Sequence, residues 1–497
     1  MDTAVSPHSS LASMLDEWPP QARIGGTWVS TVPGGSFAVS DPATGEILAH
    51  VPNMGAAETA EAIAAARAAQ PDWARKSVLE RSGILRGWAD LIRRDSEALS
   101  RLLVVEQGKP LDEARGELAY SADFLDWFAE EARRPHGHTI PSGIPGTRMT
   151  TIRQPIGVGA CITPWNFPAS MIARKAAPAL AAGCAIVIKP SEQTPLIALA
   201  LVRLAVEAGI PNGVVNIVTG DREAAAVIGR ELTTNPAVHK ISFTGSTAVG
   251  SQLMAQAAQT VKNVALELGG NAPLIVFDDA DIDLAIQATM SAKFRNAGQA
   301  CIAANRILVQ RGIHDSFVEK LTHAISQLVV GNGLDETTDI GPLISTAAVD
   351  KVHRHVTDAI QRGATLAAGG QQPRTDGSFY APTLLVDLPP GALLCDEETF
   401  GPVAAVQRFD TEADAIALAN ATSYGLAGYV FTTNADRVIR VSEALETGLV
   451  AVNVGVFTTP VAPFGGVKQS GLGREGGAEG LHDWQETKYI CQGVLPA

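Results

Sequence analysis

Apolar residues between positions 156 and 267 occur in short continuous runs rather than in alternation. Runs at 156–162, 185–189, 214–218 and 239–243 are typical of strands, and helical stretches near 168–182, 195–208, 222–230 and 247–258 separate them. A fifth strand is expected to end at Glu267. Strands without alternation that are joined by helices form a parallel sheet buried on both faces. The pattern therefore predicts an α/β half in this part of the chain.

A second series of apolar runs follows the glycines at 269–270. These runs predict strands at 274–277, 307–309, 384–386, 403–406, 428–431 and 449–453. The chain is therefore α/β throughout, with two halves that join at 267–270. Ligands bind between such halves, at the carboxyl ends of the strands.

The region before the first strand is predicted to be irregular at 1–40 and helical after that. An Ala-rich helix is expected from 56 to 70, with a stop at Pro71, and another spans roughly 112–133. Between them, Leu85, Trp88 and Ile92 recur at the spacing of an amphipathic helix.

Composition and charge exclude several classes of protein. The 497 residues have 46% hydrophobic content and a formal charge of −14, which disfavours nucleic acid and anionic membranes as partners. Five scattered cysteines without a CxxC pair indicate reduced thiols, with neither a disulfide framework nor a metal site. Residues 1–4 lack the features of a signal peptide, and no apolar run reaches membrane-spanning length. We expect a cytoplasmic enzyme.

One cysteine lies where a catalytic thiol could work. Cys301 sits in a loop of small residues at 293–306, and Gly298 allows an unusual turn just before it. Backbone N–H groups of such a loop can stabilise an oxyanion that forms when sulfur attacks a carbonyl. The alternative is that Cys301 is a small buried filler, as free cysteines usually are.

Four further segments place polar groups at predicted strand ends or tight turns. Asn166 lies between two prolines, a rigid setting for an oxyanion donor. Lys189 and Glu192 follow the second strand, Glu267 precedes two glycines, and Glu398 lies in a tight turn. Each segment alone is typical of a cap or a turn, but together they supply what a thiol mechanism needs.

Two glycine-rich segments compete as a phosphate loop. Residues 471–476 (GLGREG) match the dinucleotide fingerprint but do not follow a strand, so we reject them. Residues 243–250 follow an apolar strand and open a helix, which is the context that a pyrophosphate site requires.

These motifs together resemble the NAD(P)-dependent aldehyde dehydrogenase superfamily, and within it the succinate-semialdehyde dehydrogenases. The resemblance runs from about residue 20 to the end through PWNFP, KPSEQTP, FTGS, LELGGNAP, KFRNAGQAC, EETFGP and APFGGVKQSGLGREG. It implies an aldehyde dehydrogenase fold with a Rossmann-like cofactor domain at 1–137 and 158–266. It also implies an α/β catalytic domain at 267–470 and a small β oligomerisation arm at 138–157 and 471–497.

The resemblance also implies a mechanism and a set of site residues. Cys301 would attack the aldehyde, Asn166 would hold the oxyanion, and Glu267 would activate water to hydrolyse the thioester. The residues that would bind NAD or NADP are Trp165, Asn166, Lys189, Pro190, Ser191, Glu192, Gly245, Ser246, Leu268, Glu398, Phe400 and Phe464. A carboxylate at Glu192 would accept bonds from ribose hydroxyls but repel a 2′-phosphate, so NAD is the preferred cofactor.

The substrate side is expected to hold a carboxylate. Arg174 and Arg295 match arginines that clamp the distal carboxylate of succinate semialdehyde, and Thr458 supplies a hydroxyl to the pocket. The alternative is that both arginines form structural ion pairs. Phe457 and Pro460 depart from the family pattern, which leaves the chain length of the preferred semialdehyde open.

The remaining expectations concern assembly and rival functions. Alternating residues at 148–154 favour an exposed antiparallel ribbon, and the resemblance implies a homo-oligomer, dimer or tetramer, built through it. One rival is a dehydrogenase for a neutral or longer aldehyde. A dehydrogenase that passes the acyl group to coenzyme A would lack the Glu267 base. A hydrolase with Cys301, Glu267 and Lys189 would need no cofactor, and a non-catalytic protein would have lost a key residue.

Overall fold

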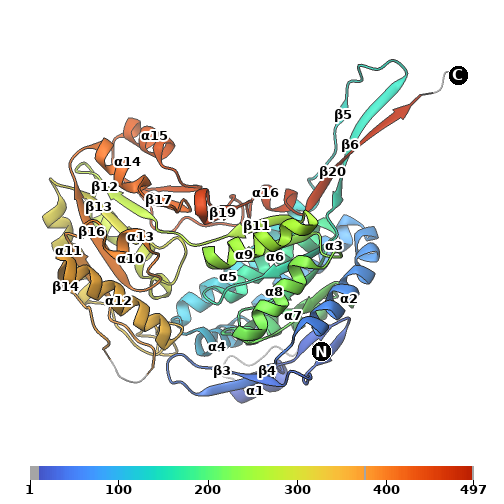
Figure 1. The fold of residues 1–497 in the computed structure, drawn as a ribbon, viewed down its shortest axis with the longest axis horizontal. Helices are drawn as coiled ribbons and strands as arrows, with labels where there is room; N and C mark the ends of the chain where they lie inside the picture. The colour runs from blue at the N-terminus through green and yellow to red at the C-terminus, as the bar shows by residue number, and fades with distance from the viewer. Residues whose placement is uncertain (1–9, 374–376, 495–497) are drawn as a thin grey trace.

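The computed structural model describes residues 10–373 and 377–494, arranged as two α/β lobes and a projecting β arm (Figure 1). Residues 1–4, on which the signal-peptide prediction rests, lie outside this range, as do the last three residues of the predicted arm. Among the described residues, no helix combines the length and the apolar character that crossing a membrane requires.

An eight-stranded sheet forms the core of the first lobe. Its order is β19 (Gly471–Leu472), β11 (Asn263–Glu267), β10 (Lys240–Thr244), β7 (Val158–Ile162), β8 (Ala185–Lys189), β9 (Val215–Ile217), β1 (Ala22–Ile24) and β2 (Thr27–Val29). The five strands from β11 to β9 are parallel, so the predicted parallel sheet is confirmed.

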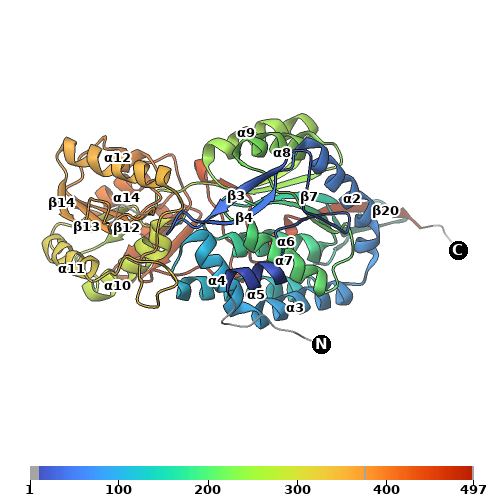
Figure 2. The same ribbon diagram turned by 90° about the horizontal axis from the view of Figure 1, so that it is seen from below.

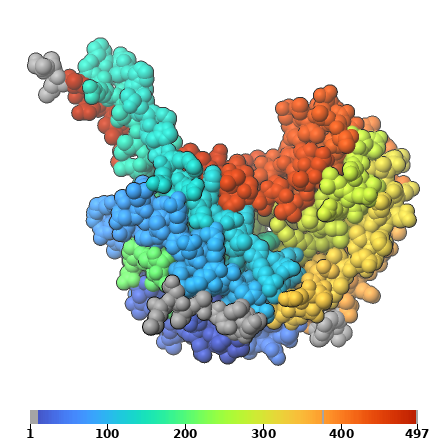
Figure 3. Space-filling model, turned by 180° about the vertical axis from the view of Figure 1, so that it is seen from behind, coloured from blue at the N-terminus to red at the C-terminus, as the bar shows by residue number. Residues whose placement is uncertain are grey.

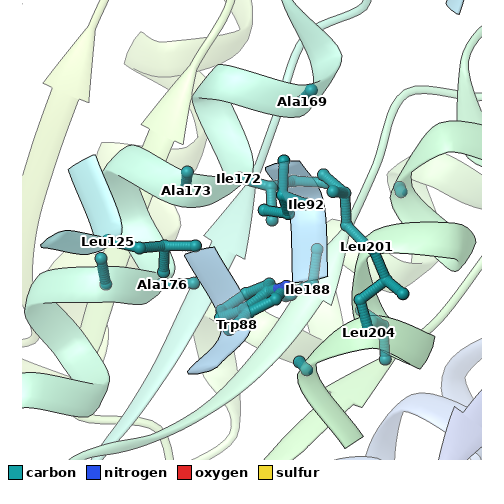
Figure 4. Packing of buried hydrophobic residues seen from close by; sticks show 14 of the residues in the cluster. Trp88, Ile92, Leu125, Ala169, Ile172, Ala173, Ala176, Ile188, Leu201 and Leu204 are labelled. Atoms are coloured by element: carbon teal, nitrogen blue, oxygen red, sulfur yellow. The ribbon is translucent and has the colours of Figure 1, made fainter. Parts of the chain in front are cut away.

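Helices cover both faces of this sheet, and successive residues of β8 contact opposite layers. Ile186 and Ile188 pack with Trp88 and the layer of α3 (Val78–Arg94), α4 (Ser96–Gln107), α5 (Leu111–Glu131), α6 (Pro168–Ala182) and α7 (Pro195–Glu207), as Figure 4 shows in part. Ala185 and Val187 pack on the other face (Figure 2), against α2 (Ala56–Arg75), α8 (Arg222–Thr234) and α9 (Thr247–Ala257). Burial on both faces is why these strands show no alternation.

Two predictions for the amino-terminal region are wrong. Residues 1–40 are not wholly irregular, because α1 (Leu11–Glu17), β1, β2 and β3 (Ser36–Ser40, paired with β4, Ile47–Pro52) lie there. Strands of three residues are too short to show a periodic pattern. Helix α2 continues through Pro71 to Arg75, because Trp73 is buried and its indole N–H donates to the Leu180 carbonyl at 3.1 Å. Tertiary packing outweighs the helix-breaking tendency of the proline.

The second lobe contains a seven-stranded sheet. Its order is β14 (Thr365–Ala368), β15 (Thr383–Val386), β16 (Val403–Phe409), β13 (Arg306–Gln310), β12 (Pro273–Val276), β17 (Ala427–Phe431) and β18 (Leu449–Val452). One face packs against α10 (Ile282–Phe294), α11 (His314–Ser326), α12 (Thr346–Arg362) and α13 (Leu393–Asp396), and the other against α14 (Glu412–Asn420) and α15 (Ala435–Ala444). All six strands predicted for the second half are present.

A three-stranded arm extends from the first lobe. Strand β6 (Thr147–Pro155) pairs antiparallel with β20 (Gln485–Gly493), which follows α16 (Glu479–His482), and with β5 (Thr139–Ile140). The predicted antiparallel ribbon is therefore confirmed. In Figure 3 the arm projects from the two lobes, and a concave surface separates it from the second lobe.

Candidate active site

The predicted motifs meet at one edge of the first sheet. The parallel register pairs Ile162 with Lys189 and Thr244 with Glu267, so β7, β8, β10 and β11 all end at this edge. The segments that follow these strands carry Asn166, Glu192, Gly245 and the glycines after Glu267. The sheet therefore brings together residues that are up to about a hundred positions apart in the sequence.

Two cavities meet at Cys301. The first, of about 280 Å³, has in its lining the predicted residues Trp165, Asn166, Gly245, Ser246, Glu267, Leu268, Glu398 and Phe400. The second, also of about 280 Å³, includes Arg174, Arg295, Thr458 and Phe464. Cys301, Phe167 and Met171 line both. The thiol thus lies where a ligand in one cavity can meet a ligand in the other.

Three successive left-handed residues shape the loop before Cys301. Asn296, Ala297 and Gly298 have φ values of 50°, 53° and 72°. The unusual turn predicted at Gly298 is confirmed, but it begins two residues earlier. The Asn296 side chain stabilises it, because its Oδ1 accepts from Gln107 at 3.1 Å and its Nδ2 donates to the Asn166 carbonyl at 2.9 Å. Non-glycine residues hold this conformation only where such contacts fix them.

Gly270, in the Gly-Gly turn after Glu267, packs against the loop that carries Cys301. A Cβ atom at Gly270 would lie 2.2 Å from the Cys301 carbonyl oxygen, so only glycine fits this contact. Gly270 therefore ties the segment of the candidate base to the segment of the candidate nucleophile.

Asn166 is buried and held at both its backbone and its side chain. Its carbonyl accepts from Lys109 Nζ and from Asn296 Nδ2, each at 2.9 Å. Its own Nδ2 donates to the Gln299 carbonyl at 3.0 Å. An amide nitrogen carries two N–H donors, so the second can serve an oxyanion beside Cys301.

Burial raises the pKa of both the candidate nucleophile and the candidate base. Burial is the largest cause that raises the pKa of the Cys301 thiol to about 12, and the nearby Glu398 carboxylate is the second. The positive charge of Arg174 opposes this shift. Burial and then Glu475 also raise the pKa of Glu267 well above its ordinary value. Neither carboxyl oxygen of Glu267 has a hydrogen-bond partner among the described residues. Such perturbed groups in a cavity are typical of an active site.

The second cavity is lined by two arginines and by two acidic side chains, Glu113 and Glu117. Arg174 is almost fully buried, with Nε 3.1 Å from Glu475 Oε2 and its guanidinium 4.1 Å from the Phe464 ring centre. Arg174 therefore forms a structural ion pair, as the alternative interpretation expected, and its side chain also lines the cavity. Arg295 forms no ion pair in the part of the chain that the structure describes, and its guanidinium lies 5.3 Å from the Phe167 ring centre. Phe464, which the sequence assigned to the cofactor cleft, lies in this second cavity instead.

Residues of the first cavity are positioned from several directions. Glu398 Oε1 accepts from the Gly270 N–H at 2.9 Å, and burial raises the pKa of Glu398 to about 7. The Trp165 and Phe400 rings meet edge to face, with centres 5.4 Å apart. Ser246 caps α9 by accepting from the Val249 N–H at 3.4 Å, so the helix amino terminus faces this cavity.

The segment from Lys189 to Glu192, including Pro190 and Ser191, lies at the neighbouring strand end and does not line either large cavity. Lys189 Nζ lies 3.7 Å from Glu192 Oε2. The hydrolase alternative needs Lys189 beside Cys301, and Lys189 does not line either of the cavities that meet at Cys301.

The rejected GLGREG segment turns out to hold a buried charge. Gly471 and Leu472 form β19, which pairs antiparallel with β11, so the segment is not a strand–turn–helix phosphate loop. Its Glu475 contacts Arg174 and Lys175, and Lys175 also donates to Thr244 Oγ1 at 2.7 Å. No sequence motif indicates the pair of Glu475 and Lys175, because 300 positions separate the two residues.

Among the described residues, no group of three His, Cys, Asp or Glu side chains is arranged to hold a metal ion. The five cysteines are free thiols.

Comparisons with known proteins identify the family and several relatives of the chain. The profile described as "Aldehyde dehydrogenase family" matches residues 28–490. The chain is 53% identical to a succinate-semialdehyde dehydrogenase of Escherichia coli (strain K12) whose name specifies NADP(+), over 95% of this chain and 98% of the relative. The chain is also 53% identical to a glutarate-semialdehyde dehydrogenase of Pseudomonas aeruginosa, over 96% of this chain and 98% of the relative. A crystal structure titled as an E. coli NADP-dependent enzyme superposes with a TM-score of 0.95 at 53% identity, covering 96% of this chain and 99% of that one.

Proposed function

The chain belongs to the aldehyde dehydrogenase family, and on that premise we propose that it oxidises a semialdehyde acid, such as succinate or glutarate semialdehyde, to the dicarboxylic acid with NAD(P). The observation that carries this proposal is the position of Cys301 at the junction of two cavities. One cavity suits the cofactor, and the other presents arginines to an anionic substrate. A comparison of turnover with succinate semialdehyde, glutarate semialdehyde and an uncharged aldehyde tests the proposal.

The residues of the first cavity fit a nicotinamide cofactor. The Glu398 carboxylate can accept from ribose hydroxyls, Trp165 and Phe400 can enclose a flat ring, and the α9 amino terminus suits a pyrophosphate. The bound cofactor would supply the hydride acceptor. We assign the cofactor domain to residues 1–137 and 158–266 and the catalytic domain to 267–470. The arm predicted at 138–157 and 471–497 is too long at its second segment, because β19 (Gly471–Leu472) lies in the first sheet and Trp484 packs in the core of the first lobe, so β20 (Gln485–Gly493) is the part that belongs to the arm.

The protein residues account for the steps at the substrate carbon. The Cys301 thiol gives its proton to solvent as Sγ bonds to the aldehyde carbon, and the resulting oxyanion accepts from the Asn166 amide and from a backbone N–H of the Cys301 loop. Loss of hydride from that carbon leaves a thioester on Cys301. Glu267 takes a proton from water, which attacks the thioester, and the carboxylic acid departs as the thiol is regenerated. Glu267 also argues against transfer of the acyl group to coenzyme A.

We expect Arg295 to provide most of the affinity for the substrate carboxylate, because Arg174 is shared with Glu475. Replacing Arg295 with Leu (R295L) should raise KM for succinate semialdehyde about 30-fold, the order of a lost charge-assisted hydrogen bond. KM for an uncharged aldehyde of similar length should change less than about twofold on the same scale. Initial-rate kinetics on both substrates measure the difference.

Arg311, an exposed arginine that pairs with Asp410, provides the matched control, and R311L should leave both KM values unchanged. An equal rise of both KM values in R295L would contradict the clamp and favour a structural role for Arg295.

For the cofactor, we propose a preference for NAD, supported by the Glu192 carboxylate. The names of both E. coli relatives specify NADP, so the two cofactors must be compared directly. Wild-type kcat/KM should be about tenfold higher with NAD, the order expected from one like-charge repulsion. E192S should lower this ratio to about one on the same reasoning. Glu223, exposed in the first turn of α8, gives the control E223S. A wild-type preference for NADP would refute the proposed role of Glu192.

We also propose that the chain forms a homo-oligomer, dimer or tetramer, through the arm. Nine residue pairs connect β6 and β20, and Ile140, Ile144 and Tyr489 are exposed apolar side chains on this arm. Exposed apolar side chains grouped on a projecting ribbon are typical of an interface. The free thiols support a cytoplasmic location.

A further inference from the structure

Helix α12 holds the turn that carries Glu398. Lys351 Nζ donates to the Glu398 carbonyl oxygen at 2.6 Å. One helical turn later, His355 Nε2 lies 3.1 Å from Glu397 Oε2, and His355 Nδ1 lies 3.3 Å from Thr399 Oγ1. Two side chains of one helix thus contact three successive residues of the turn.

The contacts of His355 define which ring nitrogen carries the proton. A carboxylate only accepts hydrogen bonds, so Nε2 donates to Glu397. Burial, and then the charge of Lys351, lower the pKa of His355, although Glu397 opposes them, so the ring is neutral near pH 7. Nδ1 then accepts from the Thr399 hydroxyl. One neutral imidazole therefore fixes the residues on both sides of Glu398.

The turn needs such support because it is both strained and closely packed. Phe400 has a φ of 56°, a left-handed conformation that is unusual for a large side chain. A Cβ atom at Gly401 would lie 2.4 Å from Val352 Cγ2 on α12. On its other side, the Gly401 carbonyl oxygen would lie 2.2 Å from a Cβ atom at Gly298, in the loop before Cys301. The turn is thus held between α12 and the nucleophile loop.

We propose that His355 is a positioning residue for cofactor binding, and that it acts by holding Glu397 and Thr399 so that Glu398 faces the first cavity. This inference rests on the proposed function. His355 is fully buried and lines neither large cavity, so it acts only through the turn. Lys351 and Thr399, in contrast, line the first cavity themselves.

Titration of NAD against the purified full-length protein, by isothermal calorimetry without aldehyde, tests the proposal. H355F keeps a buried ring but loses both hydrogen bonds, and we expect its Kd for NAD to rise about three- to tenfold, the order of one or two net hydrogen bonds. H355Q can still donate to Glu397 and should recover part of this loss. H353F provides the matched control, because His353 is exposed on the same helix and contacts Tyr380 instead of the turn. Its Kd should equal that of the wild type.

The combination of H355F with T399V separates positioning from a general structural role. If His355 acts through Thr399, the effects of the two substitutions on Kd will be less than additive in free energy. T399V alone also tests the contact if H355F does not fold. An unchanged Kd in H355F or in T399V, even with a lowered melting temperature, would overturn the inference while leaving the proposed function intact. If the wild type binds neither NAD nor NADP, the role of His355 and the proposed function are both wrong.

Discussion

Replacing Cys301 with serine (C301S) is expected to lower the rate of NADH formation by about 10⁴-fold, the order seen when an enzyme loses its nucleophile. A serine hydroxyl in the same loop is a much weaker nucleophile than a thiol, and it forms an ester in place of a thioester. Calorimetric titration should give an unchanged Kd for NAD, because the side chain is only one part of the cavity lining.

Cys395 provides the matched control for this prediction. It is half-buried like Cys301, but it contacts Pro389 and Gln407 in the second lobe. C395S should retain the activity of the wild type. Activity of C301S within tenfold of the wild type would exclude a covalent mechanism at this residue.

Replacing Glu267 with glutamine (E267Q) should separate the two halves of the reaction. Without the base, hydrolysis of the thioester is expected to slow about 10³-fold, within the range for general base catalysis. Acylation can still proceed once, so rapid mixing should show a burst of one NADH per active site before a slow steady state. Mass spectrometry of the quenched protein should find the acyl group on Cys301.

The pKa of Glu267 gives this prediction a pH dependence. Only the ionised carboxylate can take a proton from water, and burial raises the pKa of Glu267 well above its ordinary value. The wild-type kcat should therefore rise with pH as this carboxyl group ionises, whereas the steady-state rate of E267Q should lack that rise. If E267Q lost the NADH burst as well as the steady-state rate, the assignment of Glu267 to deacylation would be contradicted.

The parts of the fold that local patterns determine could be predicted from the sequence. The ranges of α6 and β8 were predicted correctly, because Pro168 starts the helix, Gly183 ends it in the left-handed conformation, and the strand is buried on both faces. Gly298 was predicted to turn because glycine adopts positive φ freely, and its φ of 72° agrees. The left-handed Asn296 and Ala297 could not be foreseen, because tertiary contacts of Asn296 stabilise them.

The parts of the site that depend on distant contacts could not be predicted. Arg174 and Glu475 pair across the first lobe, and no local pattern connects positions 301 apart. Phe464 lines the cavity with Arg174 and Arg295 and not the one with Glu398, which the sequence could not indicate, because a strand-free loop gives no information on the direction of its side chains. His355 looks like one of several polar residues on an amphipathic helix, and only the structure shows that it contacts Glu397 and Thr399. Motifs identified the chemistry, whereas packing determined which residues share a cavity.

We propose that Cys301 joins a cavity for the cofactor to a cavity that selects anionic aldehydes. The most direct test compares kcat/KM for succinate semialdehyde, glutarate semialdehyde and an uncharged aldehyde of similar length, each with NAD and with NADP. We expect values at least about tenfold higher for the semialdehyde acids, the order of one charge-assisted contact. Faster turnover of the uncharged aldehyde, or no cofactor reduction with any of the three, would contradict it.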